Sequence, residues 1–176
     1  EYTADQIVIS TGAKQSLLNI FLALVNPGDE VIIPAPYWVS YMDQADYCGA
    51  DVKVLPTTME SGFKITAAQL ESAITPKSKV LIFSSPNNPC GAVYSKEDLA
   101  AIAAVVAKHP NLYIISDEIY ELLNYGEVSH VSIASFPEVY NQTITLNGLS
   151  KGFAMTGWRI GYIGAPEWIA KACTKF

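Results

Sequence analysis

The sequence predicts an α/β fold in which helices flank a mostly parallel β-sheet. Short β-rich runs alternate along the chain with segments of helical periodicity, as in a sheet built from strand–helix–strand units. The strand-like runs are short and apolar, which is typical of strands buried on both faces of a parallel sheet. The chain has 176 residues and 50% of them are hydrophobic, which fits one ordinary domain. We therefore expect a single domain over residues 1–176.

Seven segments have the short apolar pattern of strands, bounded in most cases by turn-forming residues. These segments cover residues 7–9, 30–33, 52–55, 79–83, 112–115, 143–146 and 159–163. Ligands in such sheets bind beyond the carboxyl ends of the strands. A site is therefore expected in the loops that follow these segments.

Five segments between the strands are expected to be helical. They run from Gly12 to Val25 and over residues 39–47, 67–74, 95–108 and 166–176. In the first of them Leu17, Phe21 and Leu24 fall on one side, as in an amphipathic helix. Ser95 is the expected N-cap of the fourth helix, because its hydroxyl oxygen can accept a backbone N–H from the first turn.

Composition argues against several classes of function. The net charge of -6 disfavours nucleic-acid binding, which needs a basic face. No apolar run reaches about 18 residues, so no membrane span is expected. The three cysteines are far apart and form no CxxC pair, which favours a reducing compartment. We expect a cytoplasmic protein, or a plastid one if its source is a plant.

The small number of histidines argues against two further kinds of active site. His109 and His130 are the only two, so a histidine-rich metal site and a serine–histidine triad are poorly supported. No metal is expected. The glycine-rich motifs GxGxxG and GxxxxGK[ST], which bind nucleotides, are absent.

Four clusters of residues remain at the ends of expected strands. Thr11–Lys14 opens a helix, where small residues let backbone N–H groups approach an anion, although a plain tight turn is the commoner reason for Gly12. Ser85–Gly91 is a proline-rich loop that could hold an amide against a ligand oxygen, and a simple Asx-Pro turn is the alternative.

The other two clusters contain the charged groups. Ser116–Tyr120 places two carboxylates and a phenol at a strand end, where partial burial is costly without partners, whereas an isolated acidic pair usually lies at the surface. Asn147–Tyr162 places Lys151 among small and apolar residues, with Arg159 eight positions later. A desolvated lysine becomes an amine nucleophile, and the alternative is a lysine whose amine reaches solvent.

Together the four clusters resemble the class I aminotransferases, which are pyridoxal-phosphate (PLP) enzymes of fold type I. Gly148–Gly161 fits the lysine signature of that family. Ser116–Glu121 (SDEIYE), Asn87–Gly91 (NNPCG) and Met155–Tyr162 (MTGWRIGY) are similar to the bacterial and plastid aspartate/prephenate branch. The resemblance implies that residues 1–176 are the PLP-binding large domain. An N-terminal segment and a C-terminal small domain are then expected outside this sequence.

The resemblance also implies catalytic roles for three residues. Lys151 would carry PLP covalently on its amine and, once displaced by a substrate, would move a proton between the substrate Cα and the cofactor. Asp117 would keep the pyridine nitrogen protonated, which makes the ring a better electron sink. Tyr120 would donate a hydrogen bond to the phenolic oxygen of PLP, together with Asn88.

Further positions are implied to bind the phosphate, the ring and the substrate. Arg159 would pair with the phosphate in the bidentate way that suits guanidinium. The phosphate cup would be completed by Gly12, Ala13, Lys14 and Ser150. Trp38 would stack on the pyridine ring, with Tyr37 as the adjacent alternative and simple core packing open for either. The substrate would contact Trp38, Asn88 and Lys14.

The implied reaction is transamination between an amino acid similar to aspartate or glutamate and a 2-oxo acid, in a protein that forms a homodimer. Two alternatives stay open: a PLP-dependent C–S lyase or elimination enzyme, and a PLP-binding fragment without turnover. The residue at position 120 bears on the first alternative, because the lyase branch often differs just after Asp-Glu-Ile. The sequence departs from the usual family pattern at Cys90, where threonine is common. Cysteine is also small, so little effect is expected.

Overall fold

The fold predicted from the sequence is confirmed by a computed structural model, which describes residues 1–176. Seven strands form one sheet in the order β1-β7-β6-β5-β4-β2-β3. They are β1 (Ile7–Ser10), β2 (Glu30–Pro34), β3 (Asp51–Leu55), β4 (Ser78–Ser84), β5 (Tyr113–Asp117), β6 (Thr143–Gly148) and β7 (Gly161–Gly164). Neighbouring strands are parallel from β3 to β6, and β7 runs antiparallel to both β6 and β1.

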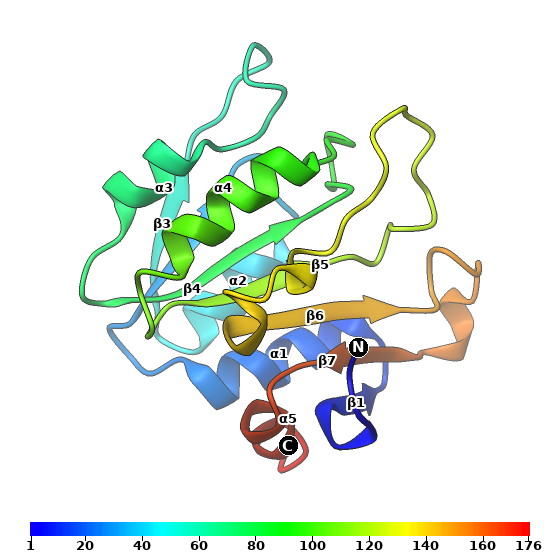
Figure 1. The fold of residues 1–176 in the computed structure, drawn as a ribbon. Coiled ribbons are helices and arrows are strands. Elements are labelled where there is room, and N and C mark those ends of the chain that lie inside the picture. Colours follow the sequence, from blue (N-terminus) through cyan, green and yellow to red (C-terminus); the bar gives the residue numbers. More distant parts are fainter.

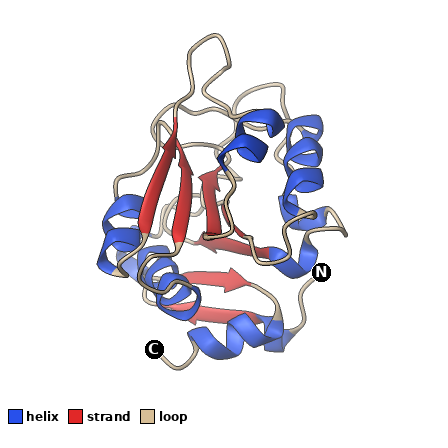
Figure 2. Cartoon of the chain, turned by 90° about the vertical axis from the view of Figure 1, so that its left-hand side faces the viewer, coloured by secondary structure: helices blue, strands red, loops and turns tan.

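Helices cover both faces of this sheet, as the two views of the chain show (Figures 1 and 2). The α-helices are α1 (Ala13–Leu24), α2 (Ser40–Tyr47), α3 (Ala67–Ala73), α4 (Lys96–Val106) and α5 (Glu167–Cys173). Buried side chains of α1, α2 and α5 pack in one core cluster, and those of α3 and α4 pack in the other. No helix combines the length and the apolar character needed to cross a bilayer.

The side chains of a strand alternate between the two faces of the sheet and so contribute to both core clusters. In β2, Val31 and Ile33 pack on the side of α1, whereas Ile32 packs on the side of α4. All three are fully buried. Successive side chains of a strand point to opposite faces, so a strand covered on both faces must be apolar throughout. This is why the strands appear in the sequence as continuous apolar runs.

The element boundaries differ from the sequence prediction at several places, including the end of β5, the start of β7 and the end of the last helix. β5 extends to Asp117, which pairs with Ser84 of β4, so this carboxylate lies in the strand and not in the loop after it. β7 begins at Gly161, because Arg159 adopts a left-handed backbone conformation with a φ of 54°. The last helix ends at Cys173 and does not reach the end of the chain. The predicted cap is confirmed, because Ser95 Oγ accepts the Asp98 N–H at 3.1 Å.

The sheet brings distant segments of the chain to one edge. β1 runs in the same direction as the parallel strands, because both β1 and β6 are antiparallel to β7. The carboxyl ends of β1, β2, β4, β5 and β6 therefore meet at the same edge, and β7 starts there. In Figure 1 the arrows of β4 and β6 point toward this edge, where the loop after β5 and the turn after β6 also lie.

Candidate active site

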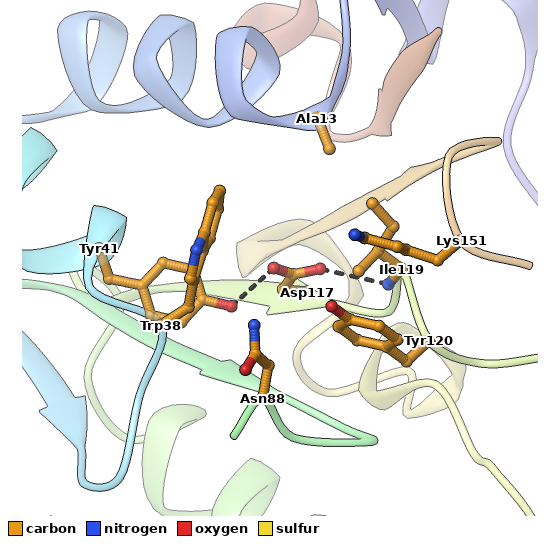
Figure 3. A pocket seen from close by; sticks show the side chains of 8 residues that line it. All are labelled: Ala13, Trp38, Tyr41, Asn88, Asp117, Ile119, Tyr120 and Lys151. Atoms are coloured by element: carbon orange, nitrogen blue, oxygen red, sulfur yellow. Dashed lines mark hydrogen bonds between the residues drawn. The ribbon is translucent and has the colours of Figure 1, made fainter. Parts of the chain in front are cut away.

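A pocket opens at this edge of the sheet, between α1, α2 and the strand ends (Figure 3). Its lining comes from five segments that are far apart in the sequence. The lining residues are Ala13, Trp38, Tyr41, Asn88, Asp117, Ile119, Tyr120 and Lys151. Six of these eight residues belong to the set that the sequence predicted, and Tyr41 and Ile119 do not.

Asp117 lies at the bottom of the pocket with only 5% of its surface exposed. Tyr41 donates its hydroxyl hydrogen to Asp117 Oδ2 at 2.6 Å, and the Ile119 N–H donates to Oδ1 at 3.2 Å. Burial raises the pKa of Asp117 to about 6, against the opposite effect of these two hydrogen bonds. The carboxylate is therefore held in one orientation and has an unusually high proton affinity for an aspartate.

Tyr120 and Asn88 lie together on one side of Asp117 (Figure 3). Partial burial and the negative charge of Asp117 raise the pKa of Tyr120, while its contact with the Asn88 amide acts in the opposite direction. The Tyr120 hydroxyl therefore keeps its proton and can donate a hydrogen bond into the pocket. Asn88 offers an amide beside it, as the sequence analysis predicted.

Lys151 reaches the pocket from the turn that follows β6. Its amine lies 6.0 Å from the centre of the Tyr120 ring. The side chain lines the pocket, although the residue as a whole is exposed in this chain. Within this turn, Ala154 adopts a left-handed backbone conformation with a φ of 53°.

The aromatic wall of the pocket is Trp38, and Tyr37 does not line it. The Trp38 ring meets the Tyr41 ring edge to face, with 5.7 Å between the ring centres. The Lys14 amine lies 4.9 Å from the centre of the Trp38 ring, a distance that favours a cation–π contact. Tyr37 instead donates its hydroxyl to Met42 Sδ at 3.6 Å. Of the two predicted alternatives, only Trp38 presents its ring to the pocket.

The start of α1 forms a bare corner, where Gly12 has no side chain to cover the backbone. Gly12 has a φ of 88°, and a Cβ atom there would lie 2.4 Å from Arg159 Nη2, so the guanidinium rests directly on this glycine. A Cβ on Gly161 would lie 2.1 Å from the Ala13 nitrogen, so the start of β7 packs tightly beside it. The backbone N–H groups at a helix start lack helical acceptors. Ser150 is buried in the turn that precedes Lys151.

The Ser85–Gly91 loop is fixed by its own polar contacts. Asn87 donates its Nδ2–H to the Pro36 carbonyl oxygen and to Ser84 Oγ, both at 3.2 Å. Asn87 Oδ1 accepts the Cys90 backbone N–H at 3.3 Å and lies 3.0 Å from the Cys90 thiol. The loop that holds Asn88 is therefore tied to the segment that holds Trp38, and Cys90 still contacts Asn87 in place of the usual threonine.

Comparison with known proteins identifies the family to which this chain belongs. The sequence matches the model of class I and II aminotransferases over residues 1–176. The chain belongs to the class I and II aminotransferase family. The sequence-based resemblance is thus confirmed, and so is the fold type that it implied.

Individual relatives of this aminotransferase-family chain are similar over nearly its whole length. It is 51% identical over 174 residues to a bifunctional aspartate aminotransferase and glutamate/aspartate-prephenate aminotransferase of Petunia hybrida. It is 47% identical over 173 residues to a probable aspartate/prephenate aminotransferase of Rhizobium leguminosarum bv. phaseoli. These alignments cover 99% and 98% of this chain, but 36% and 43% of the two relatives. The chain therefore spans about two fifths of the length of the curated relatives that it matches.

Solved aminotransferase structures agree with the same fold. The crystal structure of an aspartate aminotransferase from Rhizobium meliloti superposes with a TM-score of 0.96 at 43% identity, over 99% of this chain and 44% of that one. An aspartate aminotransferase from Thermus thermophilus with maleate gives a TM-score of 0.94 at 44% identity, over 98% and 44% of the two chains.

Sequence analysis of this aminotransferase-family chain missed the two partners of Asp117. Tyr41 is 76 positions away from Asp117 in the sequence, and its position near Trp38 gives no hint of a hydrogen bond to a carboxylate. Ile119 contributes only a backbone N–H, which no side-chain pattern can reveal. The only available signal was the cost of burying Asp117, which requires donors somewhere in the fold.

Proposed function

We propose that this chain is the PLP-binding part of an aminotransferase that transfers an amino group between an amino acid and a 2-oxo acid. The observation that carries the proposal is Asp117, a buried carboxylate fixed by two hydrogen bonds at the bottom of a pocket. Such a group suits a ring nitrogen that must stay protonated. Lys151 and Tyr120 face the same pocket, which gives it an amine and a phenol as well.

The residues around the pocket fit PLP at each part of the molecule. The bare corner at Gly12, with the Arg159 guanidinium against it and the start of α1 beside it, suits a phosphate group. Trp38 offers a flat face for the ring, and Asn88 and Tyr120 offer donors for the phenolic oxygen. The remaining members of the proposed phosphate cup are Ala13, Lys14 and Ser150. Bound PLP supplies an aldehyde that condenses with amines and a ring that withdraws electrons from the substrate Cα.

Three side chains would hold or move protons in this reaction. Asp117, whose carboxylate is fixed by the Ile119 N–H, would hold a proton at the ring nitrogen. Tyr120 keeps the proton on its hydroxyl, because burial and the charge of Asp117 raise its pKa, and donates it as a hydrogen bond. Lys151 would carry the cofactor on its amine and, once released from it, would accept a proton from the substrate Cα at Nζ.

We propose aspartate or glutamate as the amino donor and prephenate among the 2-oxo acid acceptors. Support comes from relatives at 47–51% identity that are named for aspartate, glutamate/aspartate and prephenate. Lys14, stacked near Trp38, places a positive charge at the edge of the pocket, which suits a second carboxylate of such substrates. Asn88 and Trp38 would complete the contacts with the substrate.

The proposal is tested by assaying transamination from aspartate to 2-oxoglutarate or prephenate with the purified PLP-loaded protein. We expect turnover in the wild type and a loss of at least about 100-fold in Lys151→Ala, because the proton-transferring amine is removed. Lys175→Ala is the matched control, since this lysine is exposed near the end of the chain, and it should retain wild-type turnover.

The same assay separates the alternatives. Release of pyruvate and ammonia from cystathionine without a 2-oxo acid acceptor would identify a C–S lyase and contradict the proposal. Covalent PLP on Lys151 without any turnover would identify a cofactor-binding fragment. The family names of the relatives favour transamination over both.

A further inference from the structure

The segments that carry Tyr120 and Lys151 are joined by a polar contact outside the pocket. Asn147 of β6 donates its Nδ2–H to Glu121 Oε1 at 2.8 Å, while its own Oδ1 accepts the Gly148 N–H at 2.7 Å. Glu121 directly follows Tyr120, and Asn147 precedes Lys151 by four residues. The Glu121–Asn147 pair therefore connects the two pocket residues through very short stretches of chain.

A buried network holds the glutamate end of this pair in place. Glu118 is 3% exposed, and its Oε1 accepts hydrogen bonds from Ser116 Oγ at 2.8 Å and Ser132 Oγ at 2.7 Å. His130 Nε2 lies 3.2 Å from Glu118 Oε2 and 3.9 Å from Glu121 Oε2. The loop after Tyr120 is thus anchored at both of its ends to the end of β5.

The asparagine end is equally constrained. Asn147 is 6% exposed and pairs with Tyr162 of β7 in the sheet. The lysine turn also packs on the residue after Glu121, since a Cβ atom on Gly152 would lie 2.9 Å from Leu122 Cδ1. The hydrogen bond between Glu121 and Asn147 joins these two segments directly, so it can hold them at one separation.

Neither Glu121 nor Asn147 lines the pocket, and the proposed function assigns them no role. We propose that they are positioning residues whose hydrogen bond sets the separation between the Tyr120 hydroxyl and the Lys151 amine. The catalytic consequence rests on the proposed function, because it matters only if both groups act on the same cofactor. The positioning effect itself does not depend on the cofactor.

The first arm of the test therefore uses the chain without cofactor. Amide hydrogen exchange is measured at Leu149, Ala154 and Met155, whose N–H groups are hydrogen-bonded within or beside the lysine turn. In Glu121→Ala we expect exchange at these amides to accelerate about fivefold, the factor that corresponds to one net hydrogen bond. Glu121→Gln keeps an oxygen acceptor for Asn147 and should stay within about twofold of the wild type.

The second arm uses the PLP-loaded protein. In Glu121→Ala we expect kcat for transamination to fall about tenfold with KM little changed, because the reacting groups are misplaced while the substrate contacts remain. The pH at which the absorbance of bound PLP changes should also shift, and Glu121→Gln should restore both quantities. Asn147→Ala should lose at least as much as Glu121→Ala, because it also removes the acceptor of the Gly148 N–H. The double variant should lose little more than Asn147→Ala, because the contact between the two side chains is already absent there.

The two arms distinguish the failure of this inference from the failure of the proposed function. Unchanged exchange in Glu121→Ala, or equal losses in the Ala and Gln variants, would overturn the positioning role even if the protein transaminates. Faster exchange in Glu121→Ala and its rescue in Glu121→Gln would support the positioning role even if the wild type took up no PLP. Glu121 has a side chain that is 36% exposed, so its replacement should leave the fold intact, which far-UV circular dichroism checks.

Discussion

At the scale of single residues, Asp117 shows how the fold accommodates a carboxylate in a buried place that disfavours its negative charge. Water reaches only 5% of its surface, and its two donors come from α2 and from the loop after β5. An unpaired charge in such a place would cost several kcal/mol. The Tyr41 hydroxyl and the Ile119 N–H offset part of that cost, and a protonated ring nitrogen in the pocket would offset more.

The first prediction concerns the pH dependence that Asp117 gives to the chain without cofactor. Its pKa is about 6 in the folded chain, against 3.8 for an ordinary aspartate, so the folded chain binds this proton more tightly than the unfolded chain does. The free energy of unfolding should therefore fall as the pH rises from 3.8 to about 6, by about 3 kcal/mol relative to Asp117→Asn, which has no proton to lose. Urea unfolding of both chains across this interval measures the difference, and a difference independent of pH would contradict the prediction.

The residue scale also shows where prediction from sequence stops. Lys151, Asp117 and Asn88 could be predicted because each stands in a motif that combines reactive and turn-forming residues in the expected order. Tyr41 and the Glu121–Asn147 pair could not, because each hydrogen bond joins segments whose proximity only the sheet order reveals. The sequence left the exposure of Lys151 open, because the small and apolar residues that flank it in sequence do not show how far the turn is covered in the fold.

At the scale of elements, the corner at Gly12, which we propose binds phosphate, depends on how closely β7 packs against α1. Gly161 leaves no space for a side chain, because a Cβ atom would lie 2.1 Å from the Ala13 nitrogen and 2.3 Å from the Gly12 carbonyl carbon. These neighbours are backbone atoms, which cannot rotate away. Packing of this kind fixes the position of Arg159, which lies two residues before Gly161.

We predict that Gly161→Ala moves β7 away from α1. The expected loss in the free energy of unfolding is at least about 2 kcal/mol, as for other overpacking changes, and affinity for inorganic phosphate or PLP should fall with it. Gly157→Ala is the control, because no atom lies within 4 Å of a Cβ atom at that glycine. Thermal unfolding and phosphate titration measure the two effects, and similar behaviour of the two variants would count against this packing account.

Most elements could be predicted because local signals agree with the tertiary structure. Strands buried on both faces appear as apolar runs, and the Ser95 cap marks the start of α4. Boundaries that depend on pairing could not be predicted as well. Asp117 is polar and resembles the start of a loop, but it stays in β5 because it pairs with Ser84 and Leu146 on either side.

At the scale of the whole molecule, two large apolar side chains are exposed close together in the sequence. Phe153 is 58% exposed and Trp158 is 71% exposed, and both belong to the segment that follows Lys151. Two large apolar groups so close in sequence suggest a surface that another chain covers. This agrees with the proposed homodimer, in which a second subunit would lie next to the site.

We predict that the protein self-associates through this surface. Sedimentation at micromolar concentrations should detect dimers, and the double change Phe153→Ser/Trp158→Ser should shift the population toward monomers by at least about tenfold in the dissociation constant. Met59→Ser serves as the control, because Met59 is 75% exposed in the loop between β3 and α3. Dimers that persist equally in all three proteins would place the interface elsewhere.

The central claim is that this pocket binds PLP through Lys151. It is tested most directly by mixing the purified chain with PLP, recording the absorbance spectrum, reducing with borohydride and mapping the labelled peptide. The account predicts a shifted absorbance band and a label confined to Lys151, with neither in Lys151→Ala. An unchanged spectrum, or a label spread over the other lysines of the chain, would contradict it.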